Sequence, residues 1–348
     1  MSKKRVFGII LAAIVIAIVA VLGVNYRAVR AVYKNWTVGH LELVDLTPWE
    51  GGEALLEVPY AEDSPNQYVD LYIPEGERAP LFVMIHGGGF ISNDARSRQA
   101  RLMLQYFRDH GYACASVNYR LAQEAPFPGA LCDCKAAIRY LILNADKYGY
   151  DADNFIVWGE SAGGYLATMC AVTSDDEFAD VRCLGQDDST PVSTRPGRLV
   201  DYYGHIDNRG IHDDWRALGI PEFVVKIANR WLDVEEVRDY EDMESYWARK
   251  NISEMTEEEF ARMDPYTYLN KNDLAGLKAW IVHGDCDITV PYLHSQRLND
   301  ALVQKLGGDS VVYTLVPGMG HASDPLYSDD LLGALDTWLQ ETGKQTKS

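Results

Sequence analysis

The stretch Gly159-Glu160-Ser161-Ala162-Gly163-Gly164 decides how this sequence is interpreted. It follows the apolar run Phe155–Trp158, which predicts a strand, and it precedes Tyr165–Val172, which predicts a helix. A serine held on a tight turn between a strand and a helix needs glycine two positions before and after it, because larger side chains would collide there. Ser161 is therefore predicted to stand above the carboxyl end of a sheet as a nucleophile.

A second glycine-rich run, His86-Gly87-Gly88-Gly89-Phe90, follows the predicted strand Leu81–Ile85. Glycines let bare backbone N–H groups approach a carbonyl oxygen closely, and donors of this kind stabilise the negative charge that develops on it. We expect the N–H groups of Gly87, Gly88 and Ala162 to form such an oxyanion hole. Phe90 and Glu160 are expected to border the substrate pocket.

A serine nucleophile needs a histidine as general base and a carboxylate that orients the histidine. On a strand–turn–helix of this type the acid follows the serine in the chain and the histidine comes last. His321 combines that order with a glycine-rich loop after the predicted strand Val311–Val316. Asp287 follows the predicted strand Ala279–His283 and is the expected acid. Asp285 lies nearer the end of that strand and is the alternative.

Strand-like and helix-like segments alternate along most of the chain. The clearest helices are expected at Ser97–His110 and Pro128–Tyr148, where apolar residues recur at helical spacing. This alternation predicts an α/β fold with a mostly parallel central sheet and helices on both faces. Between the sixth and seventh strands, which lie near Tyr203 and Ala279, residues 207–263 are predicted to form a helical insertion that caps the sheet.

Further motifs point to a known family. They are Asn118-Tyr119-Arg120-Leu121, Ala125-Pro126-Phe127-Pro128, Asp133-Cys134-Lys135-Ala136-Ala137-Ile138-Arg139 and the segment His283–Pro291. With the two glycine motifs, residues 67–339 resemble the α/β-hydrolases of the esterase/lipase superfamily. More narrowly, they resemble the branch of bifunctional feruloyl and acetyl-xylan esterases, BD-FAE.

The resemblance implies an α/β-hydrolase fold and places the family's acid on Asp287. It also implies hydrolysis of a small-molecule or carbohydrate ester through an acyl-enzyme, by Ser161, Asp287 and His321, with no metal or organic cofactor. Two other functions stay open. One is a serine peptidase of the prolyl-oligopeptidase type, and the other is a non-catalytic scaffold on a hydrolase fold.

The N-terminal segment predicts a membrane anchor. Val6–Val24 is a run of 19 residues without a polar side chain, and as a helix it would span about 28 Å, close to the thickness of a bilayer's hydrocarbon core. Lys3, Lys4 and Arg5 precede it, which favours a cytoplasmic N-terminus. We therefore expect a signal-anchor over residues 1–25, a stalk over 26–48 and an extracytoplasmic catalytic domain over 49–343. A cleaved secretory signal is the alternative.

The overall charge disfavours nucleic acid as a partner. The chain has 32 Lys and Arg against 51 Asp and Glu, which gives a net charge of −19. Such a chain repels phosphate backbones. Its six cysteines are too few for a disulfide scaffold, although a bridge between Cys170 and Cys183 stays open in an exported protein. No motif indicates an oligomeric state.

Overall fold

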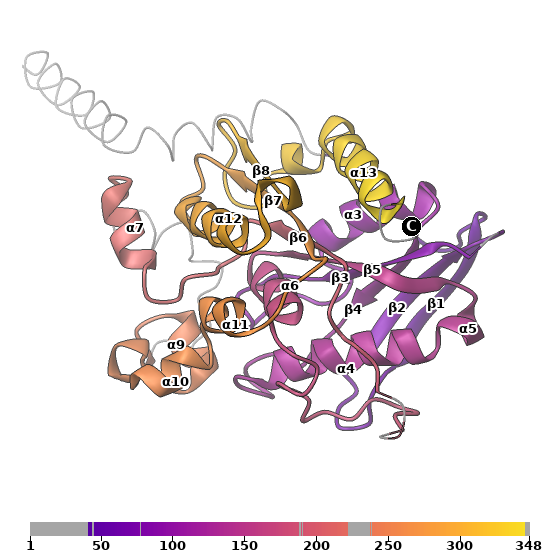
Figure 1. Ribbon diagram of the computed structural model, residues 1–348, viewed down its shortest axis with the longest axis horizontal. Coiled ribbons are helices and arrows are strands. Elements are labelled where there is room, and N and C mark those ends of the chain that lie inside the picture. The colour runs from indigo at the N-terminus through magenta and orange to yellow at the C-terminus, as the bar shows by residue number, and fades with distance from the viewer. Residues whose placement is uncertain are drawn as a thin grey trace, which may run out of the picture.

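The computed structural model describes residues 41–344, apart from residues 44, 77, 188, 190, 222–236 and 238. Within these residues no helix combines the length and the apolar character that a membrane span requires. The predicted anchor Val6–Val24 lies outside the described residues, and so does most of the predicted stalk. Figure 1 shows a twisted central sheet with helices packed on both of its faces.

The sheet has eight strands in the order β1-β2-β4-β3-β5-β6-β7-β8. β1 and β2 are antiparallel, and so are β2 and β4, whereas each pair from β4 onward is parallel. The fold is thus the mostly parallel α/β architecture that the sequence predicts. The strands are β1 (Gly52–Pro59), β2 (Tyr68–Pro74), β3 (Pro80–Ile85), β4 (Ala113–Val117), β5 (Asp151–Glu160), β6 (Arg198–Tyr202), β7 (Lys278–Gly284) and β8 (Val311–Val316).

Helices cover the sheet on both sides. In chain order they are α3 (Arg98–Asp109), α4 (Gly129–Leu143), α5 (Ala145–Tyr148), α6 (Ala162–Val172), α7 (Ile211–Ala217), α9 (Met243–Ala248), η3 (Ile252–Glu254), α10 (Glu257–Ala261), α11 (Pro265–Lys271), α12 (Leu293–Leu306), η4 (Gly308–Ser310), η5 (Asp324–Tyr327) and α13 (Asp329–Lys344). Buried side chains of α4, α6 and α12 share one hydrophobic core, and those of α3 and α13 belong to a second core.

The central strands are apolar on both faces because each face is covered. In β3, Leu81, Val83 and Ile85 belong to the first core, whereas Phe82 and Met84 belong to the second. Successive side chains of a strand point to opposite faces, so a strand buried on both sides has an uninterrupted apolar sequence. This arrangement fixes the strand ends rigidly, and the loops that follow them lie at one edge of the sheet.

Two segments differ from the sequence-based expectation. The edge strand β1 is missing from the predicted set, because most of its residues are half-buried or exposed and its sequence lacks a β-branched run. The predicted helix Pro128–Tyr148 is divided into α4 and α5 at Asn144, whose side-chain amide donates to the Tyr140 carbonyl at 2.8 Å. Such local bonds compete with the regular helical pattern.

The predicted insertion contains α7, α9, η3 and α10, all between β6 and β7. Residues 222–236 and 238 within it lie outside the described part of the chain. The helix α9 packs against the main domain, since Trp247 is fully buried and its carbonyl accepts a hydrogen bond from the Phe127 N–H at 2.8 Å. The described part of the insertion is therefore attached to the same end of the domain as Ser161.

Candidate active site

Ser161 occupies a strained turn between β5 and α6. Its backbone has φ 55° and ψ −120°, a conformation that L-residues rarely adopt. The turn is packed so closely that a Cβ on Gly159 would lie 2.0 Å from the Gly163 carbonyl oxygen, and a Cβ on Gly163 would lie 2.1 Å from the Ile85 oxygen. The two glycines are therefore required by contact with neighbouring backbone, as expected for a serine held on a tight turn between a strand and a helix.

His321 lies against this serine. It is placed by the loop after β8, and its Nε2 is 3.0 Å from the Ser161 Oγ, within hydrogen-bond range. Its other ring nitrogen, Nδ1, is 2.7 Å from the Asp287 Oδ2. Burial alone would lower the pKa of His321, but the Asp287 carboxylate outweighs it and the pKa is raised. The imidazole can therefore accept a proton from the serine and be stabilised as a cation.

Asp287 is held as a buried carboxylate. Although its burial favours the neutral acid, His321 and His283 lower the pKa of Asp287 well below its usual range. The backbone N–H groups of Thr289 and Val290 donate to its Oδ1 at 2.8 and 3.0 Å. This set of donors keeps the charge fixed opposite His321.

Asp285, the alternative acid, has a different partner. Its Oδ1 accepts a hydrogen bond from the Gly318 N–H at 2.5 Å. It therefore braces the loop that carries His321, and it is Asp287 whose carboxylate lies against the imidazole.

The structure corrects the expectation for Gly87. Its N–H donates to the Glu160 Oε1 at 2.7 Å and so is not available to a substrate oxygen. The N–H groups of Gly88 and Gly89, by contrast, have no acceptor among the described residues. Both of these glycines have positive φ, 109° and 62°, which turns the loop sharply after Gly87. Gly89 was missing from the predicted set, because a run of three glycines does not reveal which N–H groups a neighbour occupies.

Glu160 and Phe90, the residues expected to border the substrate pocket, are both buried. Glu160 is 3% exposed and lies beneath the glycine loop, where it accepts the Gly87 bond. Burial raises the pKa of Glu160 to about 7, against the opposing effects of that bond and of His321. Phe90 is 1% exposed, and its ring is stacked on Trp247 with the centroids 3.8 Å apart. Glu160 thus supports the glycine loop through its bond with Gly87, and Phe90 anchors the end of the loop on Trp247.

Sequence reasoning missed two further neighbours of the reacting groups. His283 donates through Nε2 to the Val290 carbonyl at 2.9 Å and lies 3.2 Å from the Asp287 carboxylate. The ring of Tyr203 meets the His321 ring edge-on, at 4.8 Å between centroids. His283 lies at the end of a strand, and no motif surrounds Tyr203. Their positions beside the reacting groups therefore become visible only when β6 packs against β7.

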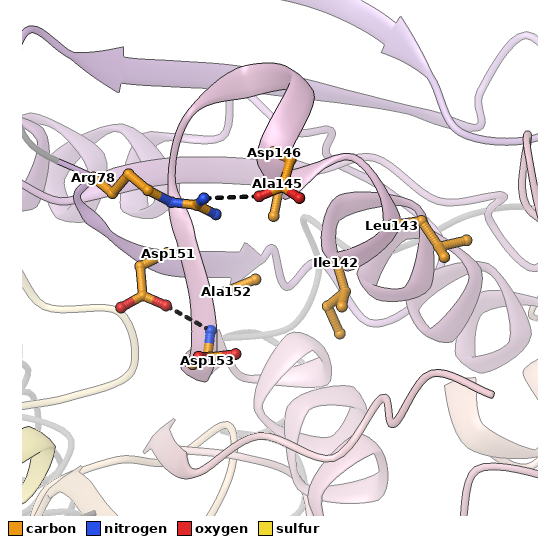
Figure 2. A pocket seen from close by; sticks show the side chains of 8 residues that line it. All are labelled: Arg78, Ile142, Leu143, Ala145, Asp146, Asp151, Ala152 and Asp153. Atoms are coloured by element: carbon orange, nitrogen blue, oxygen red, sulfur yellow. Dashed lines mark hydrogen bonds and ion pairs between the residues drawn. The ribbon is translucent and has the colours of Figure 1, made fainter. Parts of the chain in front are cut away.

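No other described feature competes with this site. Within the residues the structure describes, no group of three His, Cys, Asp or Glu side chains could hold a metal ion. Cys170 and Cys183, the pair left open by the sequence, are both free thiols. A hollow of about 510 Å³ lies beside Arg78 and its ion-pair partner Asp146, and Figure 2 shows the side chains that line it. Because Asp151 begins β5 and Ser161 follows its end, this hollow lies at the opposite edge of the sheet.

The close packing at the turn makes a stability prediction. We expect Gly163→Ala to lower the free energy of unfolding by about 2–4 kcal/mol, because the added Cβ would overlap backbone that cannot move aside. Gly308→Ala is the matched control, since a Cβ there meets nothing within 4 Å. Thermal unfolding followed by circular dichroism measures both. Equal stability of the two variants would contradict the account of the turn.

A second prediction distinguishes Asp287 from Asp285 as the carboxylate that acts on His321. Asp287→Asn should lower the pKa of His321, because it removes the charge that stabilises the imidazolium. Asp285→Asn should have a much smaller effect. NMR titration of the His321 ring nitrogens measures the shift. A larger decrease in the Asp285 variant would identify Asp285 as the partner.

Comparisons with known proteins agree with the fold. The chain is similar to Esterase LipC of Mycobacterium tuberculosis, with 26% identity over 76% of this chain and 59% of the relative. It is also similar to Esterase LipQ of the same organism, with 23% identity over 77% of this chain and 57% of the relative. The chain thus spans a little under three-fifths of the length of these curated relatives.

Solved structures with the same fold have low sequence identity. A truncated form of a carbohydrate esterase from gut microbiota matches with a TM-score of 0.65 and 22% identity, over 85% of this chain and 99% of that one. Est2 of Thermogutta terrifontis with butyrate bound matches with a TM-score of 0.60 and 20% identity, over 84% of this chain and 95% of that one. These likenesses establish an α/β-hydrolase fold.

The family model that matches the chain is BD-FAE, and it covers residues 69–302. That range includes the glycine loop, the strained turn at Ser161 and the segment with Asp287. The match extends over more than half of the chain, and this protein therefore belongs to the BD-FAE family of α/β-hydrolases.

Proposed function

We propose that this protein is a carboxylic ester hydrolase that works through an acyl-enzyme on Ser161. The observation that carries the proposal is the continuous contact from the Ser161 Oγ through the His321 ring to Asp287, at 3.0 and 2.7 Å. Membership of the BD-FAE family and the likeness to proteins named as esterases support it. The substrates we propose are esters of short acyl groups, including esters of carbohydrates.

In the first half-reaction, the Ser161 Oγ attacks the ester carbonyl carbon while its proton passes to the Nε2 of His321. The carbonyl oxygen becomes an oxyanion, which accepts hydrogen bonds from the N–H groups of Gly88, Gly89 and Ala162 in this proposal. Collapse of the tetrahedral intermediate breaks the ester C–O bond, and the leaving alcohol takes the proton from His321.

In the second half-reaction, water gives a proton to His321 and attacks the acyl carbon. The Ser161 oxygen then leaves, recovers the proton, and the carboxylic acid is released. Asp287 stays ionised throughout and stabilises the imidazolium in both halves. Loss of one oxyanion donor typically reduces kcat by about 10²–10³-fold. We therefore expect each N–H group that the glycine loop donates to the oxyanion to contribute a rate factor of this size.

The proposal is tested with p-nitrophenyl esters from acetate to laurate. We expect the full-length protein to hydrolyse the short esters, and Ser161→Ala to reduce kcat/KM by at least about 10³-fold, because the nucleophile is removed. Ser189→Ala, at an exposed serine away from the turn, is the control. Folded wild-type protein that hydrolyses aminoacyl amides but no ester would favour the peptidase. Failure to react with a fluorophosphonate as well would favour the scaffold.

The pH profile gives a separate prediction. The Glu160 carboxylate raises the pKa of His321, so Glu160→Gln should lower that pKa. The acid limb of kcat/KM reports the base in the free enzyme and should therefore move to lower pH. Asp146→Asn removes a carboxylate from an exposed ion pair and should leave the limb in place. An unmoved limb would contradict this electrostatic effect and leave Glu160 only its hydrogen bond to Gly87.

A further inference from the structure

The loop after β6 places His205 against the nucleophile turn. Its backbone N–H donates to the Ser161 carbonyl at 3.3 Å, and its side chain is buried. The ring Nδ1 lies 2.7 Å from the Oε1 of Glu244, which α9 of the insertion provides. Burial opposes both charges, yet the Glu244 carboxylate raises the pKa of His205 and the imidazolium in turn lowers the pKa of Glu244. The pair therefore favours its charged form.

The other ring nitrogen of His205 has no partner. Its Nε2 makes no hydrogen bond within the described part of the chain, although the residue is only 3% exposed. Three positions along the same loop, Asn208 is 4% exposed, and neither its Oδ1 nor its Nδ2 has a partner among the residues that the structure describes. Buried polar atoms in folded proteins are nearly always paired, and an unpaired one destabilises the fold. Both unpaired side chains belong to the loop that contacts Ser161, where a polar group of a bound substrate would supply their partners.

Neighbouring side chains do not take this role. The ring nearest to His205 is that of His294, at 5.0 Å between centroids. The Nδ1 of His294 accepts the Asp207 N–H at 3.2 Å, and its Nε2, which makes no hydrogen bond within the described residues, lies 3.4 Å from the Asp214 carboxylate. The two nitrogens of His294 thus face α7 and the loop before it.

The chemistry of the unpaired atoms selects the group that fits. An imidazolium Nε2–H can only donate, whereas a carboxamide both donates and accepts. A hydroxyl group matches this combination, since it can accept from one side chain and donate to the other. A carboxylate or phosphate is disfavoured, because Glu244, Asp242 and Asp207 all act on His205 as nearby negative charges.

We propose that His205 and Asn208 form a subsite that binds a hydroxyl group adjacent to the scissile ester. The assignment rests on the proposed ester hydrolysis and adds to it the residues that select a hydroxylated substrate. Glu244 acts as a positioning residue, because it holds the His205 ring from the side opposite the free nitrogen.

The test compares pairs of esters that differ by one hydroxyl group. Trans-2-hydroxycyclohexyl acetate against cyclohexyl acetate places the hydroxyl in the alcohol part, and ethyl lactate against ethyl propionate places it in the acyl part. We expect the full-length protein to prefer the hydroxylated member of one pair by about 10-fold in kcat/KM, because one good hydrogen bond supplies that factor. The pair that shows the preference identifies the part of the substrate bound.

Two variants of His205 distinguish the contributions of its two ring nitrogens. His205→Asn can still donate to Glu244 but has no group at the position of Nε2, and should bring the preference to about 1. His205→Gln places a donor near the position of Nε2 and should retain more of the preference. Asn208→Leu, which conserves the side-chain size, should also abolish it.

Stability distinguishes ligand binding from a structural role. Asn208 makes no side-chain hydrogen bond to the described part of the protein, so Asn208→Leu should not lower the Tm. Asn272→Leu is the matched control, because the Asn272 amide donates to Val172 and Glu177. It should lower the Tm and keep the hydroxyl preference.

Three results would overturn the assignment. One is wild-type protein that hydrolyses the esters without preferring the hydroxylated member of either pair. The second is a preference that survives in His205→Asn and Asn208→Leu. The third is folded wild-type protein that hydrolyses no ester at all, including p-nitrophenyl acetate, which contradicts the proposed function itself and is thereby distinguished from the other two.

Discussion

The hydrogen bond from the Gly87 N–H to the Glu160 carboxylate joins the two glycine-rich motifs of this protein. One partner opens the loop after β3, and the other immediately precedes Ser161 at the end of β5. There is no room for a side chain on Gly87, because a Cβ would lie 2.6 Å from the Glu160 Oε1. Once this bond is made, the positions of Gly88, Gly89 and Ser161 relative to one another are set by backbone geometry.

The insertion reaches the same region from two sides. Trp247 stacks on Phe90, the residue after the glycines, while Glu244 pairs with His205, which contacts the Ser161 carbonyl. Both side chains come from the short helix α9. The described part of the insertion is therefore bound to the oxyanion loop and to the nucleophile turn at once. These contacts place α9 beside both motifs, whereas a role of the insertion as a cap stays a prediction.

The sequence was sufficient where a local rule applied. The strained turn, the order of serine, acid and histidine, and the strands beneath them follow from glycine spacing and apolar runs, and the structure brings Ser161, His321 and Asp287 into contact. The use of the Gly87 N–H was predicted wrongly, and the neighbours His283 and Tyr203 were missed. Each of these depends on side chains that meet across strands, which one-dimensional periodicity does not encode.

In the proposed mechanism, the glycine loop presents Gly88 and Gly89, and not Gly87, to the reacting carbonyl. A crystal structure of the phosphonate adduct on Ser161 would show which N–H groups bind the oxyanion, because the phosphonyl oxygen mimics it. We expect this oxygen to lie within about 3 Å of the N–H groups of Gly88, Gly89 and Ala162, with Gly87 still bonded to Glu160. A phosphonyl oxygen bonded to the Gly87 N–H, with Glu160 displaced, would contradict it.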